Sequence, residues 1–249
     1  ETTDQAQDVW EKHMESFGLG DYLGYDLPTG RPGRIPGKEY YDRVYGDGRW
    51  SSTYIISNAI GQGEVAATPI QLANMTAAIA NRGFFYTPHL IKKIGGEGIQ
   101  DLQDSRYTER KYTTIDPQHF EPVIQGMADV YSKGTARWLQ IPGVEIAGKT
   151  GTVENYTRIE GVRTQLTDHS LFIAFAPVHN PKIALAVYIE NGYYGARYAG
   201  HIASLMIEKY LKGEITRKDL EKRMLEKTLD YEYAKPYSGE EFKINEYVW

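Results

Sequence analysis

Residues 146–153 read Ile-Ala-Gly-Lys-Thr-Gly-Thr-Val, and the rest of the chain can be understood from this stretch. Its β-branched residues predict a short β-strand. Because glycine weakens a strand, Gly148 and Gly151 need a physical reason, and we expect another backbone to come close to this one. Lys149 would stand at the strand edge beside threonine hydroxyls and backbone N–H groups, an arrangement suited to the carboxylate of an extended peptide.

Two apolar runs downstream predict the sheet to which this strand belongs. Residues 170–177 and 182–190 are joined by the turn His179-Asn180-Pro181, which is typical of a buried antiparallel hairpin. Together with residues 146–153 they predict a three-stranded sheet with the lysine strand at its edge. An apolar helix over residues 199–211 would cover the sheet. The predicted fold class is therefore α+β, an antiparallel sheet covered by helices.

Further helices are expected upstream, because capping residues precede apolar periodic segments that end at glycines. They are predicted from Thr2 to Gly18, from Thr68 to Gly83 and from Asp116 to Gly134. The segments between them are expected to be a long loop over residues 24–49, a strand from residue 53 into the turn Gly61-Gln62-Gly63, and a peripheral strand pair over residues 89–115.

The composition bounds the class of protein. A chain of 249 residues with 41% hydrophobic and 24% charged residues suits one sizeable soluble core. The net charge of -5 argues against a nucleic-acid partner. The absence of cysteine excludes disulfides and thiolate sites, and the six histidines include no i, i+4 pair, so we expect neither a metal nor a cofactor. No apolar run reaches the length of about 18 residues that would span a membrane.

Two other motifs compete for the central stretch. Residues 143–150 match G-x-x-x-x-G-K-[ST], the phosphate-binding loop of nucleotide hydrolases. That loop needs a helix starting at the lysine, whereas Thr-Gly-Thr-Val after Lys149 starts none. Asp168-His169-Ser170 suggests a hydrolase triad, but successive side chains of an extended segment point to opposite faces. We expect His169 to fix the entrance to the next strand or to line a cleft.

The motifs in their order resemble the C-terminal part of the transpeptidase domain of class B penicillin-binding proteins. The resemblance rests on Gly148–Thr152, Asp168–Pro177, Ile60–Gly63, Thr68–Ala73 and Ile79–Gly83. The glutamine of the Gly61-Gln62-Gly63 turn and residues 199–211 favour the elongation type, the penicillin-binding protein 2 group, over the division type. The resemblance covers residues 1–213, and we expect residues 214–249 to form a C-terminal extension, either solvated or a docking surface.

The resemblance implies a β-lactamase/transpeptidase-like fold and a peptidoglycan D,D-transpeptidase, a serine acyltransferase that acts on D-Ala-D-Ala stem peptides and is acylated by β-lactams. Lys149 would supply charge and hydrogen bonds, and Thr150, Gly151 and Thr152 would bind substrate with it. The backbone N–H of Thr152 would form half of the oxyanion hole. The residues expected to line the cleft are Gly61, Gln62, Gly63 and His169.

The sequence departs from the family at the nucleophile. No serine has a lysine three residues on, Ser-x-Asn is absent, and Thr108–Lys111 has the spacing with the wrong nucleophile. We therefore expect a fragment, incomplete at its N-terminal side and inactive alone. Its parent would be anchored by an N-terminal helix at the periplasmic face of the inner membrane, with elongation-machinery membrane proteins as partners. The alternatives are a catalytically dead relative that binds cell-wall peptide or a partner, and the phosphate-loop nucleotide hydrolase.

Overall fold

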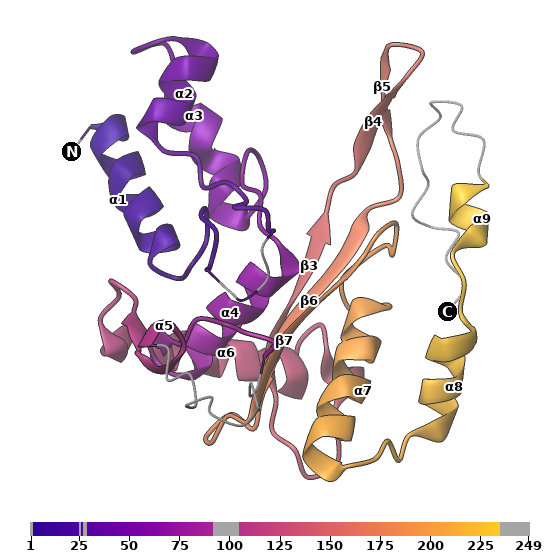
Figure 1. Ribbon diagram of the computed structural model, residues 1–249. Helices are drawn as coiled ribbons and strands as arrows, with labels where there is room; N and C mark the ends of the chain where they lie inside the picture. Colours follow the sequence, from indigo (N-terminus) through magenta and orange to yellow (C-terminus); the bar gives the residue numbers. More distant parts are fainter. Residues whose placement is uncertain (1, 25, 27–28, 92–104, 235–249) are drawn as a thin grey trace, which may run out of the picture.

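A computed structural model describes residues 2–24, 26, 29–91 and 105–234 (Figure 1). At its centre lies an antiparallel sheet of three strands, β3 (Ala147–Val153), β6 (His169–Ala176) and β7 (Ile183–Ile189), in the order β3-β6-β7. Ala147 pairs with Phe175, and Val153 pairs with His169. The predicted hairpin is therefore confirmed, and within the described residues β3 has a partner strand on one side only.

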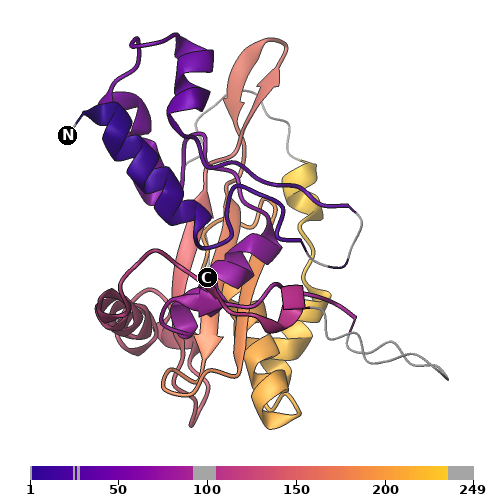
Figure 2. The same ribbon diagram turned by 60° about the vertical axis from the view of Figure 1, so that its left-hand side comes forward.

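Different helices cover the two faces of the sheet (Figure 1, Figure 2). The helices α4 (Pro69–Ala80) and α6 (Phe120–Ser132) pack on one face, and α7 (Ala199–Lys212) packs on the other. The alternation of side chains along β6 accounts for both cores, since Phe175 packs with α4 and α6 while Phe172 packs with α7 and with Tyr131 at the end of α6. The α+β prediction is confirmed.

The helices predicted from capping signals begin where they were expected. In α4 the Thr68 hydroxyl accepts a hydrogen bond from the Gln71 N–H, and the Gln71 side chain accepts one from the Thr68 N–H. Thr2 caps α1 (Thr3–Glu15) in the same way. Asp116 accepts from the N–H of Gln118 in the short 3₁₀ helix η2 (Pro117–His119), which leads into α6.

Residues 38–60 were predicted wrongly in two places. The expected loop contains α2, and the expected strand is helical: α2 (Lys38–Tyr45), α3 (Ser52–Ile55) and η1 (Ile56–Ile60). The cause is tertiary packing around Tyr41, which is fully buried. Its ring lies 5.0 Å from that of Trp50, and its hydroxyl accepts a hydrogen bond from Asn58 at 2.8 Å. Burial raises the pKa of Tyr41 to about 12, so the phenol stays protonated. This packing outweighs the β-propensity of the isoleucines.

Two smaller antiparallel pairs lie outside the central sheet. They are β1 (Phe84–Phe85) with β2 (Lys111–Tyr112), and β4 (Tyr156–Ile159) with β5 (Val162–Gln165). The β4–β5 hairpin projects beyond the central sheet, where a polar loop was expected (Figure 1). The predicted strand pair over residues 89–115 has its centre outside the described residues, which show α5 (Ser105–Thr108) and β2 in its second half.

The segment after α7 packs against the rest of the chain. It contains α8 (Lys218–Glu226) and α9 (Asp230–Tyr233), on the α7 side of the sheet (Figure 1, Figure 2). Glu208 of α7 is fully buried and accepts hydrogen bonds from the Thr216 hydroxyl at 2.5 Å and from Arg217 Nε at 2.9 Å. Residues 216–234 therefore pack against the chain through Arg217, Leu220 and Glu232, although most of their side chains are exposed. None of the described helices combines the length and the apolar character that crossing a membrane requires.

Candidate active site

The outer edge of β3 is turned toward the turn that follows η1. The carbonyl oxygen of Thr152 accepts a hydrogen bond from Gln62 Nε2 at 3.0 Å, although the two residues are 90 positions apart. In an antiparallel ladder, residues alternate between those whose N–H and C=O both face the neighbouring strand and those whose groups both face away. Since the Thr152 carbonyl is bonded to Gln62, Thr152 faces away from β6, and its N–H points outward too.

The same alternation places the N–H and C=O of Thr150 on the outer edge. Lys149 Nζ donates to the Thr150 carbonyl oxygen at 2.7 Å, so the ammonium group lies along this edge. The Lys149 side chain is exposed. The Thr150 hydroxyl lies 3.3 Å from that of Thr135, which precedes the 3₁₀ helix η3 (Arg137–Leu139). Cationic charge, hydroxyls and backbone donors therefore gather along one open strand edge.

Gly148 has the steric reason that the sequence suggested, whereas a Cβ on Gly151 would meet only the Leu171 side chain, at 3.2 Å and beyond. A Cβ on Gly148 would lie 2.8 Å from the carbonyl oxygen of Ile173 and 3.0 Å from the buried ring of Tyr131. The backbone of Gly195 approaches that of Gly151. A Cβ added to Gly195 would lie 2.5 Å from the carbonyl oxygen and 2.7 Å from the nitrogen of Gly151. The loop after β7 thus packs directly behind the predicted substrate-binding strand.

The turn Gly61-Gln62-Gly63 brings its glutamine to this edge. Gly61 and Gly63 have φ angles of +74° and +69°, in the left-handed region that glycine adopts without strain. A Cβ on Gly63 would also meet Asn58 Oδ1 at 3.1 Å. Both glycines are required by the path of the backbone, and Gln62 is the member of the turn that contacts β3.

His169 is the first residue of the central strand β6 and pairs with Val153, four positions along the ladder from the pair of Lys149 and Ile173. Its Nδ1 accepts a hydrogen bond from the Asn191 N–H at 3.1 Å. Burial lowers the pKa of His169, so the ring is neutral near pH 7. The Ser170 hydroxyl donates to the Tyr194 carbonyl at 3.1 Å, so Asp168-His169-Ser170 is no triad. This network matches the expected role of fixing the entrance to β6.

The phosphate-loop interpretation of residues 143–150 is wrong. Residues 147–153 form a continuous strand, and no helix starts at Lys149 to present backbone N–H groups to a phosphate. Among the residues that the structure describes, no group of three histidine or acidic side chains is placed to hold a metal ion.

Comparison with known proteins decides the family. Residues 3–208 match the model of the penicillin binding protein transpeptidase domain. This chain belongs to that family. The peptidoglycan D,D-transpeptidase MrdA of Acinetobacter baumannii is 34% identical over 218 residues, which are 85% of this chain and 32% of MrdA. The chain therefore spans about a third of the length of the curated relatives it matches.

Solved structures of penicillin-binding proteins share the fold. Pseudomonas aeruginosa PBP2 in complex with WCK 5153 superposes with a TM-score of 0.68 at 32% identity, covering 85% of this chain and 44% of that one. Penicillin-binding protein A from Mycobacterium tuberculosis, solved as a ceftriaxone acyl-enzyme complex, gives 0.63 at 28% identity, with 82% and 43% covered. The resemblance to class B transpeptidases of the penicillin-binding protein 2 group is therefore confirmed, and so is the transpeptidase-like fold.

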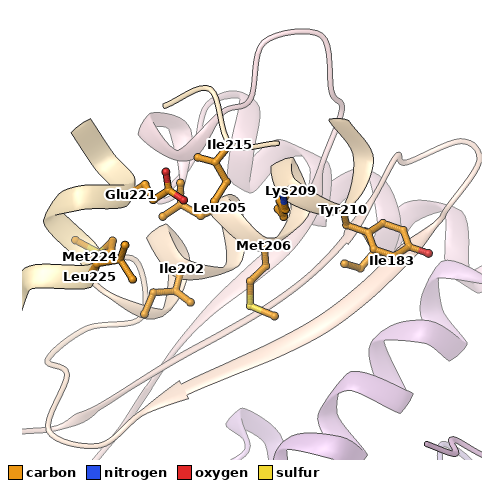
Figure 3. A pocket seen from close by; sticks show the side chains of 10 residues that line it. All are labelled: Ile183, Ile202, Leu205, Met206, Lys209, Tyr210, Ile215, Glu221, Met224 and Leu225. Carbon is orange, nitrogen blue, oxygen red and sulfur yellow. The ribbon is translucent and has the colours of Figure 1, made fainter. Parts of the chain in front are cut away.

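The chain also has an apolar groove of about 570 Å³ between α7 and α8 (Figure 3). None of the predicted site residues lines it. Its lining residues are Ile183, Ile202, Leu205, Met206, Lys209, Tyr210, Ile215, Glu221, Met224 and Leu225.

Two residues that lie against β3 were not found from the sequence. Thr135 follows Gly134, which marked only a helix end, and no local signal indicated its contact with Thr150. Gly195 lies in a glycine loop that was visible as such, but its approach to Gly151 depends on the sheet register.

Proposed function

We propose that the outer edge of β3 holds the D-alanyl-D-alanine end of a peptidoglycan stem peptide, as part of a D,D-transpeptidase. The observation that carries the proposal is the open edge of β3 with Lys149 lying along it. The outward N–H groups of Thr150 and Thr152 can donate hydrogen bonds to the oxygens of a peptide end that lies along this edge. The ammonium group and the hydroxyls of Thr150 and Thr152 suit the terminal carboxylate, because charge-assisted hydrogen bonds are the strong ones.

The reaction that this geometry fits is acyl transfer. A serine hydroxyl attacks the carbonyl carbon of the penultimate D-alanine, the C–N bond breaks, and the terminal D-alanine leaves with the proton. The outward N–H of Thr152 would supply half of the oxyanion hole, and the loss of one such donor typically costs about 10²–10³ in rate. Since no serine of this chain lies in Ser-x-x-Lys, we assign the nucleophile to the parent protein, outside this sequence. β-Lactams would acylate that same serine.

Gln62 would define the other wall of the site. Its amide reaches Thr152 from the α1–η1 side, while Lys149 lies along β3 itself. Gly61 and Gly63 would shape the turn that carries it, and His169 would support the end of the edge through Asn191. Family membership supports a place for the parent protein at the periplasmic face of the inner membrane, with elongation-machinery membrane proteins as partners.

The test is acylation by fluorescent penicillin. We expect residues 1–249 to remain unlabelled, and a longer chain that includes the parent's Ser-x-x-Lys segment to be labelled. In the longer chain, Lys149→Ala should lower the labelling rate on the order of 10²-fold, since it removes the cation of the site. Lys182→Ala, at another exposed lysine, is the matched control and should label normally. Labelling of residues 1–249 alone would refute the assignment of the nucleophile.

One observation favours a second candidate, a catalytically dead relative that binds cell-wall peptide. That observation is the missing nucleophile motif itself. The two candidates differ in the longer chain. If it binds a peptide ending in D-Ala-D-Ala through Lys149 but is not labelled by penicillin, the binding function stands and the transpeptidase does not.

A further inference from the structure

Glu232 of α9 is a fully buried carboxylate in the segment that follows the family match. It accepts a hydrogen bond from the Thr167 hydroxyl at 2.5 Å and another from the hydroxyl of Tyr193. A buried carboxylate is unfavourable unless its oxygens are hydrogen-bonded, so this arrangement specifies how α9 docks. Thr167 lies just before β6, and Tyr193 lies in the loop after β7. Glu232 therefore links α9 to two segments at the end of the central sheet.

Tyr193 is held in a backbone conformation that needs support. Its φ angle is +66°, and a bulky non-glycine residue stays there only when its surroundings fix it. The Tyr193 N–H donates to the carbonyl oxygen of Asp168 at 3.0 Å, and its side chain is buried with its hydroxyl on Glu232. The carboxylate thus fixes the side chain of a residue whose main chain is bonded to the strand entrance.

Two residues further on, the same loop touches the candidate site. The backbone of Gly195 packs against Gly151, closely enough that a Cβ there would lie 2.5 Å from the Gly151 carbonyl oxygen. The Ser170 hydroxyl donates to the Tyr194 carbonyl at 3.1 Å and also accepts from the Ala199 N–H at 3.3 Å. The loop therefore supports β3 and β6 directly behind Thr150 and Thr152.

Further contacts attach the α9 segment around Glu232. Lys227 Nζ lies 5.7 Å from the ring centre of Tyr231 and 6.0 Å from that of Tyr198. The Arg197 guanidinium lies 4.4 Å from the ring centre of Tyr193. Cation–π contacts of this kind add to the burial of the rings. Residues 227–234 are thus held to Tyr198 by the Lys227 cation–π contact and to the loop by the buried carboxylate, while Arg197 packs on the ring of Tyr193.

We infer that residues 227–234, through Glu232, position the 191–195 loop that backs β3 and so hold the outer edge of β3 in its binding geometry. Glu232 is a positioning residue, since it contacts Thr167 and Tyr193 and not the outer edge of β3. The consequence for peptide binding rests on the function proposed above for β3. The effect on the loop and the strands does not.

The test is hydrogen–deuterium exchange on the chain of residues 1–249. In Glu232→Ala we expect exchange over residues 147–153, 168–171 and 191–195 to rise on the order of tenfold, because two buried hydroxyls lose their acceptor. Exchange over α6 should stay unchanged. Glu232→Gln keeps the shape of the side chain and one acceptor oxygen, so its exchange rates should stay within about twofold of those of the unsubstituted chain. Glu226→Ala, at an exposed glutamate of α8, is the matched control and should change nothing.

Tyr193→Phe removes only the hydroxyl on Glu232, and should reproduce the local increase even if the alanine variant does not fold. Unchanged exchange in Glu232→Ala would overturn the inference, because Glu232 would then not position the loop. An equal increase over α6 would also overturn it, because the substitution would then have loosened the whole fold. A peptide ending in D-Ala-D-Ala, titrated by NMR, should bind more weakly to Glu232→Ala than to Glu232→Gln. If the peptide does not bind the unsubstituted chain at all, the proposed function of β3 fails, while the exchange result still decides the role of Glu232.

Discussion

The close approach of two backbones at Gly195 and Gly151 predicts a large effect from Gly195→Ala. The added Cβ would lie 2.5 Å from the carbonyl oxygen and 2.7 Å from the nitrogen of Gly151, and against the carbonyl oxygen of Leu171 as well. All of these atoms are backbone, so no side chain can turn away. Since an ordinary contact begins at 3.4 Å, the loop and β3 must separate by about 0.9 Å.

We expect this separation to destabilise the chain and to damage the site. Overpacking costs about 1–3 kcal/mol, and the rigid backbone neighbours put Gly195→Ala at the upper end of that range. For a chain of this size, about 3 kcal/mol lowers Tm by roughly 6–12 °C. In the longer chain with the nucleophile, a displacement of this size at β3 should slow penicillin acylation on the order of 10²-fold.

Thermal unfolding measures the first effect and fluorescent penicillin labelling the second. Gly126→Ala is the matched control, because a Cβ at Gly126 of α6 meets nothing within 4 Å and alanine favours the helix by up to about 1 kcal/mol. Its Tm should therefore hold or rise. A Gly195→Ala variant with the same Tm and labelling rate as the unsubstituted chain would refute the close packing of the loop behind β3.

The other predictions concern charge, pH and capping. Lys149→Ala should weaken binding of a D-Ala-D-Ala peptide by about 1.5–3 kcal/mol in an NMR titration, and Lys182→Ala should not. Glu208→Ala should lower the free energy of unfolding by about 3–5 kcal/mol in urea, because Arg217 loses its buried partner. Burial would raise the pKa of Glu208, but the hydrogen bonds from Thr216 and Arg217 outweigh it and lower the pKa. The contribution of Glu208 to the free energy of unfolding should therefore be fully present above pH 4.5, the ordinary pKa, and should be lost as the pH falls below it. Thr68→Ala should lower the free energy of unfolding by about 1 kcal/mol, followed by circular dichroism, since it removes the N-cap of α4.

The sheet and its helices were predictable because their signals are local. Two apolar runs around a Pro-containing turn specify the β6–β7 hairpin, and Thr68 with Gln71 specifies the start of α4. The edge position of β3 also followed, since the polar and glycine residues of 146–153 are unsuited to a central strand. These features depend on neighbours in sequence or on the alternation of side chains.

The errors fall where distant residues decide the conformation. Residues 53–60 have strand-like composition, yet they are helical because Asn58 and its neighbours pack around Tyr41 of α2. The charged segment after α7 looked solvated, yet Glu208 and Glu232 are buried in it or against it. No local pattern distinguishes a buried carboxylate from an exposed one, because the difference lies in hydroxyl and guanidinium partners elsewhere in the chain.

The outer edge of β3 raises a further question, since an open strand edge is a template for pairing with other chains. Here two of its outward carbonyls already hold donors, Thr150 from Lys149 and Thr152 from Gln62. A second β-strand needs alternating donors and acceptors, and it would have to displace both side chains. A carboxylate or a carbonyl oxygen needs only donors, and the N–H of Thr152 and the ammonium group supply them. The same two side chains that protect the edge from unwanted pairing therefore leave it selective for an acceptor-rich peptide end.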